Sequence, residues 1–224
     1  MIFDCHGDVW TDVTVQRDNG MKDVIKNRHL NRFNSGDIIG GIFVLWIDPP
    51  HDKNPKKRLV EMISATSTEI MGNQDILRII LEKGDFDKAL EEEKLAVIIG
   101  LEGLSGIGDN IDLLNALYMF GVRHASLTWN EENLLATGVR GNPERGVTAL
   151  GEKAIHLMEK LGIIIDVSHA NDKTFWDVYE KTTKPFIASH SNCRALCNVK
   201  RNLSDEQLKA ISERGGLVGL NSLN

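Results

Sequence analysis

Two histidines stand directly after apolar runs, in positions where they could hold a metal ion. Residues 163–167 are followed by Ser-His169, and residues 185–188 are followed by Ser-His190. Residues 172–181, between the runs, have helical period, so the pattern predicts a βαβ unit in which each histidine follows the carboxyl end of a parallel strand. Neutral imidazole is the commonest side-chain metal ligand. The alternative is that each histidine caps its strand and hydrogen-bonds a loop.

Carboxylates occur at similar places earlier in the chain. The apolar start of the chain runs into His6-Gly-Asp8, and residues two apart in an extended segment project to the same side, so both side chains can face one ion. Glu102 ends the apolar run 95–101, and a charge there needs a partner or a metal. A salt-bridged glutamate at the rim is the alternative interpretation of Glu102.

Together these side chains form a set of three imidazoles and two carboxylates, which suits zinc or a similar divalent ion. Five ligands exceed one tetrahedral site but suit two ions bridged by a carboxylate. Glu102 lies midway in strand order and is the expected bridge. Two ions about 3.5–4 Å apart can activate one hydroxide between them, so we expect hydrolysis of an amide or ester.

The elements that must position these residues alternate along the chain. The pattern predicts helices over 58–71, 74–83, 111–118, 147–161, 172–181 and from 204 onward, and strands over 2–8, 37–46, 95–103, 122–129, 163–169, 185–190 and 217–221. This indicates one α/β domain over 1–224 with a parallel sheet, a (β/α)8 TIM-type barrel lacking its eighth strand. We expect 20–35 to be a loop over the barrel mouth, 130–145 to be a substrate loop, and His124, well before its strand end, to be structural.

Composition excludes several classes of protein. The net charge is −6 and no basic block is present, so nucleic acid is not an expected partner. No apolar run reaches membrane-spanning length, so no membrane association is expected. The 3 cysteines, an odd number, argue against a disulfide framework and predict a reducing compartment and a cytoplasmic location.

Five short motifs resemble those of one known family. In order they are Asp-Cys-His6-Gly-Asp8, Gly-Leu-Glu102-Gly, Asp-Val-Ser-His169, Ala-Ser-His190-Ser-Asn and Lys-Arg201-Asn-Leu-Ser-Asp. Their order and spacing are similar to those of the membrane (renal) dipeptidase family, peptidase family M19 of the amidohydrolase-like barrels. The resemblance extends from end to end of the chain.

This resemblance implies a binuclear zinc dipeptidase that acts on dipeptides through a metal-bridging hydroxide. It assigns His6 and Asp8 to one ion, His169 and His190 to the other, and Glu102 to both. It also implies that Arg201 binds the substrate carboxylate, for which guanidinium–carboxylate pairing gives a physical reason. Trp129 and Asn130 are expected to contact substrate.

The chain departs from the family pattern in two ways. Trp129 stands where well-studied members carry a substrate-contacting histidine, and an indole cannot accept a proton as imidazole does. The family also continues into an eighth strand with an aspartate that assists proton transfer. We therefore expect a C-terminally truncated barrel whose exposed edges, 2–5 and 217–220, favour a homo-oligomer. Its activity is expected to be impaired.

Two other functions remain open at this point. One is a deacetylase or lactonase on the same barrel, with the same metals and different pocket loops. The other is an inactive, truncated barrel that only binds metal.

Overall fold

Strands and helices alternate through most of the chain, as the sequence pattern predicts. The structure is a computed structural model that describes residues 1–222. The chain divides into an N-terminal unit, residues 1–101 and 121–123, and a C-terminal unit, residues 102–120 and 124–222. That residues 1–224 form a single domain stays a prediction. Among the described residues, no helix has both the length and the apolar character needed to cross a bilayer.

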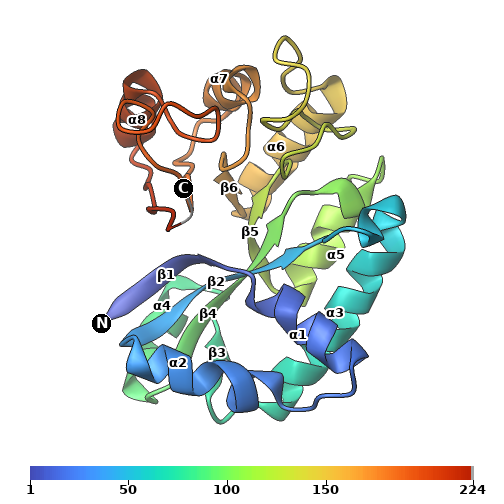
Figure 1. Cartoon of the computed structure of the whole chain (residues 1–224), viewed down its shortest axis with the longest axis vertical. Coiled ribbons are helices and arrows are strands. Elements are labelled where there is room, and N and C mark those ends of the chain that lie inside the picture. The colour runs from blue at the N-terminus through green and yellow to red at the C-terminus, as the bar shows by residue number, and fades with distance from the viewer. Residues whose placement is uncertain (223–224) are drawn as a thin grey trace. The chain divides into compact units, whose positions relative to one another are not determined.

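The N-terminal unit holds most of the sheet strands. Its elements are β1 (Ile2–Gly7), α1 (Val9–Asp18), the π-helix η1 (Ile25–His29), α2 (Leu30–Ser35), β2 (Ile38–Trp46), the 3-10 helix η2 (His51–Lys53), α3 (Pro55–Gly72), β3 (Leu77–Ile79), α4 (Lys83–Glu91) and β4 (Leu95–Glu102), whose last residue belongs to the C-terminal unit. Strands β1 and β2 are parallel neighbours, as Figure 1 shows, and β4 pairs with both β2 and β3.

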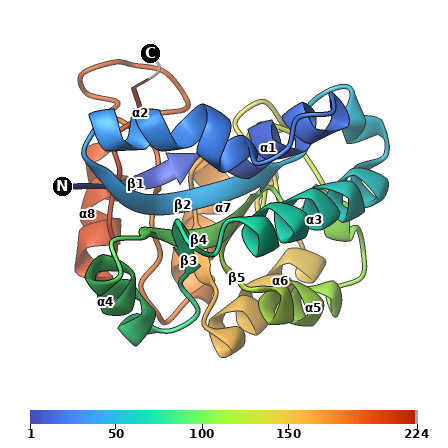
Figure 2. The same ribbon diagram turned by 90° about the horizontal axis from the view of Figure 1, so that it is seen from below.

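Apolar side chains from helices α1 and α3 and from strand β2 form the core of this unit. Trp10 of α1 and Met62 of α3 are fully buried, and the ring of Trp10 meets the ring of Phe43 of β2 edge-on at 6.0 Å. Helices α1 and α3 pack against each other (Figure 2). A Cβ on Gly40 would lie 2.0 Å from the carbonyl oxygen of Ala96, so this glycine lets β2 and β4 approach closely.

Two predicted elements of this unit are wrong. Residues 74–83 do not form a helix but contain β3, which pairs in parallel with β4. A short apolar run fits either period, and here the hydrogen bond from Leu95 N to Ile76 O, at 3.0 Å, belongs to a sheet. Residues 25–35, expected as loop, form η1 and α2, because Ile25 and Phe33 bury one side of an otherwise polar segment.

The C-terminal unit continues the alternation. Its elements are the 3-10 helix η3 (Ser105–Ile107), α5 (Leu113–Phe120), β5 (Val122–Ser126), whose first two residues belong to the N-terminal unit, α6 (Ala149–Leu161), β6 (Ile164–Asp166), α7 (Asp172–Lys181) and α8 (Asp205–Glu213). Strands β5 and β6 are parallel, with Ser126 opposite Asp166. Helix α7 spans the residues that the sequence predicts.

The last two predicted strands are present only as single parallel bridges. Ile187 pairs with Asp166, and Val218 pairs with Ala188. Hydrogen bonds flank each bridge, including Val167 N to Ile187 O at 2.8 Å and Ala188 N to Leu217 O at 2.9 Å. The predicted parallel order of these segments is therefore correct, although their paired stretches are shorter than expected. The homo-oligomer stays a prediction.

Helix α8, predicted from residue 204 onward, begins with a capping box. The hydroxyl of Ser204 accepts from Gln207 N, and the Gln207 side chain accepts from Ser204 N at 2.8 Å. Ser204→Ala removes one of these bonds and should lower the free energy of unfolding by about 0.5–2 kcal/mol in urea denaturation. Ser204→Asp, which keeps an acceptor, should retain most of the stability. Equal losses in both variants would contradict a capping role.

Candidate active site

Three predicted metal ligands lie in the C-terminal unit, each close to the carboxyl end of a strand or bridge. Glu102 is the last residue of β4, His169 follows β6 by three residues, and His190 follows the bridge at Ala188. His169 has φ of +69°, a conformation that is uncommon for residues other than glycine. Strain of this kind persists where the surroundings impose it and is frequent at functional sites.

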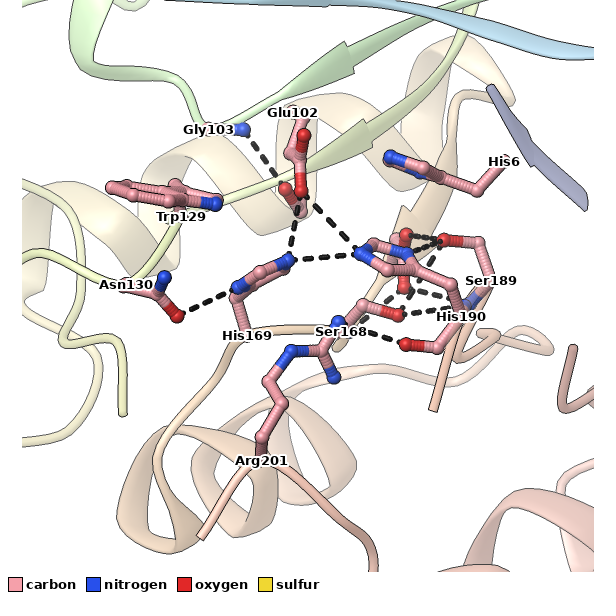
Figure 3. A network of polar contacts seen from close by, with 12 residues as sticks. His6, Glu102, Gly103, Trp129, Asn130, Ser168, His169, Ser189, His190 and Arg201 are labelled. Atoms are coloured by element: carbon pink, nitrogen blue, oxygen red, sulfur yellow. Dashed lines mark hydrogen bonds and ion pairs between the residues drawn. The ribbon is translucent and has the colours of Figure 1, made fainter. Parts of the chain in front are cut away.

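The side chains of these three residues point toward one another (Figure 3). His169 Nε2 lies 2.8 Å from Glu102 Oε1, and His190 Nε2 lies 3.4 Å from the same oxygen. The two Nε2 atoms are 2.9 Å apart. Glu102 is 6% exposed, so its carboxylate needs a compensating charge or proton.

The opposite ring nitrogen of each histidine has a partner of its own. His169 Nδ1 lies 2.8 Å from Asn130 Oδ1, and His190 Nδ1 lies 2.8 Å from Ser189 Oγ. Because an amide oxygen only accepts, His169 Nδ1 donates and its Nε2 carries the lone pair. Burial also lowers the pKa of His169, which favours the neutral imidazole that metals bind.

These contacts leave a group of acceptor atoms facing one point. Acceptors 2.8–3.4 Å apart repel unless a proton or cation lies among them. Ligands of a tetrahedral zinc ion, at bond lengths of about 2.0–2.1 Å, lie roughly 3.3 Å from one another. Two imidazoles and a carboxylate therefore fit a divalent metal ion, in both donor type and spacing.

Asp166 is a site residue that the sequence reasoning missed. It ends β6, is 4% exposed, and accepts hydrogen bonds from His124 Nε2 at 3.0 Å and from the hydroxyl of Ser189. Burial alone would raise the pKa of Asp166, but the hydrogen bond and charge of His124 outweigh it and hold that pKa well below its usual range. Glu102 was identified as a carboxylate at the end of an apolar run. Asp166 shows the same pattern.

Arg201 lies beside the histidines. Its Nη2 donates to the carbonyl oxygen of His190 and its Nη1 to the hydroxyl of Ser191, both at 2.8 Å. Burial lowers the pKa of Arg201, and the carboxylates of Asp166 and Glu102 act against that shift. The guanidinium is therefore a half-buried cation with acidic neighbours, suited to binding an anionic group.

Trp129 and Asn130, predicted to contact substrate, flank His169. The Trp129 ring is 6.0 Å from the His169 ring, and the guanidinium of Arg140 lies 5.6 Å from the centre of the Trp129 ring. The Asn130 side-chain oxygen accepts a hydrogen bond from His169 Nδ1. Contact of either residue with substrate stays a prediction.

His6 and Asp8 belong to the N-terminal unit. His6 lies near the end of β1, and Asp8 directly precedes α1. His6 Nε2 is 3.9 Å from Asp8 Oδ1, which agrees with the prediction that both side chains project to the same side. Their assignment as metal ligands stays a prediction.

Several known proteins are similar to this chain in sequence or in fold. An uncharacterised protein encoded in the pqqA 5′ region of Klebsiella pneumoniae is 40% identical over 151 residues, which are 65% of this chain and 56% of that protein. The chain thus spans little more than half the length of this relative. The crystal structure of a dipeptidase, a metallo peptidase of family M19, is similar with TM-score 0.85 and 24% identity over 98% of this chain and 72% of the other.

A second solved structure shows the same fold. It is a metallo peptidase from Rhodobacter sphaeroides liganded with a phosphinate mimic of the dipeptide L-Ala-D-Ala, with TM-score 0.87 and 23% identity over 98% of this chain and 73% of the other. These likenesses confirm the predicted α/β fold, that of the M19 TIM-type barrels. The family model for membrane dipeptidase matches residues 1–224. The chain belongs to the membrane dipeptidase family, peptidase family M19.

Proposed function

We propose that this chain carries the active site of a zinc-dependent dipeptidase. The observation that carries the proposal is the convergence of Glu102 Oε1 with the Nε2 atoms of His169 and His190, within 2.8–3.4 Å of one another. Membership of a metallopeptidase family supports the same conclusion. Borderline-soft zinc suits this mixture of imidazole and carboxylate donors.

Two ions are proposed, because the five ligand residues that the sequence predicts exceed one tetrahedral site. His169, His190 and Glu102 would hold one ion, and His6 and Asp8, with Glu102 shared, would hold the other. Zinc ions bound in this way supply an activated water and polarise the peptide carbonyl. His6→Ala should accordingly weaken mainly one of two binding events, which a zinc titration can resolve.

The remaining residues are proposed to bind and orient the dipeptide. The Arg201 guanidinium would pair with the free carboxylate of the substrate, because it is half-buried, charged and adjacent to His190. Trp129 would form an apolar wall beside His169, and could not itself accept a proton from the reaction. Asn130 would hold the His169 ring in the tautomer that leaves Nε2 unprotonated.

Metal removal followed by reloading tests this function. L-Ala-D-Ala is the first substrate to assay, because a mimic of it is bound in the Rhodobacter sphaeroides neighbour. We expect hydrolysis that a chelator abolishes and zinc restores, measured as release of free alanine. A panel that adds N-acetyl amino acids and lactones separates a dipeptidase from a deacetylase or lactonase. Zinc binding without hydrolysis of any dipeptide would contradict the proposed activity.

A further inference from the structure

Arg201 lies on a loop that is closed at its base by backbone hydrogen bonds. The loop spans residues 192–203, with bonds from Leu203 N to Asn192 O at 2.9 Å and from Arg194 N to Leu203 O at 2.8 Å. Between these ends the described residues form turns, without a helix or an extended strand. Functional side chains are held less precisely on loops than on helices or strands. The position of Arg201 therefore depends on the contacts that hold this loop.

The side chain of Arg194 contacts the backbone on both sides of Arg201. Its Nε donates to the carbonyl oxygen of Asn202 at 2.9 Å, and its Nη2 lies 3.5 Å from the carbonyl oxygen of Lys200. The second contact is long and is therefore the weaker of the two. Because Lys200 and Asn202 are the sequence neighbours of Arg201, the Arg194 side chain limits how far the backbone at Arg201 can move.

Asp172, the first residue of helix α7, anchors the Arg194 guanidinium. Nη1 of Arg194 donates to Asp172 Oδ2 at 2.9 Å and Nη2 donates to Asp172 Oδ1 at 2.7 Å, which makes the pair bidentate. The hydrogen bond from Arg194 is the largest of the causes that lower the pKa of Asp172, so both partners are charged at neutral pH. Asp172 Oδ1 also accepts Gln207 Nε2 of α8, at 3.0 Å. The loop is thus connected to two helices through one carboxylate.

We propose that Arg194 and Asp172 are positioning residues that place the Arg201 guanidinium for the carboxylate of the substrate. The inference rests on the proposed function, in which Arg201 pairs with the free carboxylate of a dipeptide. The guanidinium of Arg201 is held at its tip by the carbonyl oxygen of His190 and the hydroxyl of Ser191 (Figure 3). Its backbone is held separately, by Arg194 and, through it, by Asp172. Both ends of the side chain are therefore fixed, and the ion pair is responsible for the backbone end.

Arg194→Lys and Asp172→Asn each break this connection with little change in size. Lysine keeps the charge but loses the planar fork, and asparagine turns an amide N–H group toward the guanidinium. We expect each variant to raise KM for dipeptides roughly 3- to 30-fold, because a misplacement of about 1 Å weakens an oriented contact. The value of kcat should change little, since the carboxylate that Arg201 binds takes no part in bond cleavage. Steady-state kinetics measures both parameters.

The decisive measurement combines Arg194→Lys with Arg201→Ala. If Arg194 acts through Arg201, the double variant has the KM of Arg201→Ala alone, because no guanidinium remains to be positioned. A role in stability alone would add the same effect in both backgrounds. Hydrogen exchange of residues 193–203 in the metal-free chain reports the loop independently of activity. These amides should exchange faster in Arg194→Lys and in Asp172→Asn than in the wild type.

Glu152→Gln is the matched control. Glu152 of α6 pairs with Lys181 of α7 at 2.8 Å, and both side chains are partly exposed, as in the pair of Arg194 and Asp172. Partly exposed ion pairs contribute little to stability, so urea unfolding of all three single variants should stay near that of the wild type. The control should also keep the KM and the hydrogen exchange of the wild type.

KM values within about twofold of the wild type in both Arg194→Lys and Asp172→Asn would overturn the inference, since this is the accuracy to which independent sites add. So would an equal fold-increase in KM from Arg194→Lys in the wild-type and Arg201→Ala backgrounds. Failure of the proposed function has a different appearance. In that case the zinc-loaded wild type hydrolyses no dipeptide, although hydrogen exchange still distinguishes the two loop variants from Glu152→Gln.

Discussion

Glu102→Gln is expected to abolish zinc binding while leaving the fold intact. The carboxylate is buried and faces two Nε2 atoms, so its negative charge is what makes a cation favourable there. A glutamine keeps the size, and its amide nitrogen can donate to the imidazole lone pairs in place of a metal. Loss of a direct ligand should exceed the roughly 10–100-fold loss that removing an outer partner causes. Dipeptide hydrolysis should fall by a similar or larger factor.

Thermal unfolding with and without zinc separates this effect from a loss of stability. A ligand that binds only the folded chain stabilises it by about 2.7 kcal/mol at a concentration of 100 Kd. Wild-type protein should show this increase, and Glu102→Gln should not, although its metal-free melting temperature should be at least that of the wild type. Glu91→Gln, at an exposed position of α4, is the matched control and should respond to zinc normally. A normal zinc response in Glu102→Gln would contradict the proposed site.

Arg201→Ala is expected to raise KM for dipeptides roughly 10- to 100-fold, because a charge-assisted hydrogen bond contributes about 1.5–3 kcal/mol. The effect should lie mainly in KM if the guanidinium pairs with a carboxylate that takes no part in bond cleavage. Steady-state kinetics over a range of dipeptide concentrations measures it. Arg201→Lys should be intermediate, since lysine keeps the charge and loses the planar fork.

The structure also provides an alternative role for Arg201 that the experiment must separate. Its side chain donates to the backbone of His190 and to Ser191, so its removal could disturb the metal site itself. A dipeptide amide, which lacks the free carboxylate, distinguishes the two effects. Wild type and Arg201→Ala should differ little on the amide. An equal loss on the dipeptide and on its amide would show that Arg201 acts through His190.

The chemistry-bearing residues were accessible from the sequence because of their local setting. Glu102, His169 and His190 each follow an apolar run, and parallel strands bring their carboxyl ends to one edge. Helix α7 and the capping box of α8 were likewise predictable, because helical period and Ser-Gln spacing are properties of a few neighbouring residues. The motifs around these residues also identified the family correctly.

Local sequence pattern does not specify the element where the hydrophobic period is ambiguous. The run that contains β3 is apolar and short, and its pairing with β4, not its own pattern, makes it a strand. Residues 25–35 have the composition of a polar loop, but Ile25 and Phe33 are buried in the folded chain. In both cases the deciding free energy comes from contacts with segments far away in the chain, which local propensity does not contain.

The sequence by itself determined the α/β alternation, the family, and which side chains could bind a metal. Only the tertiary structure decided how those side chains are held. Asn130 meets His169 across 39 residues, and His124 meets Asp166 across 42 residues. A hydrogen-bond partner is selected by the position and direction of a donor to within a few tenths of an ångström. That precision arises from the packing of the strands and loops, and no spacing along the chain specifies it.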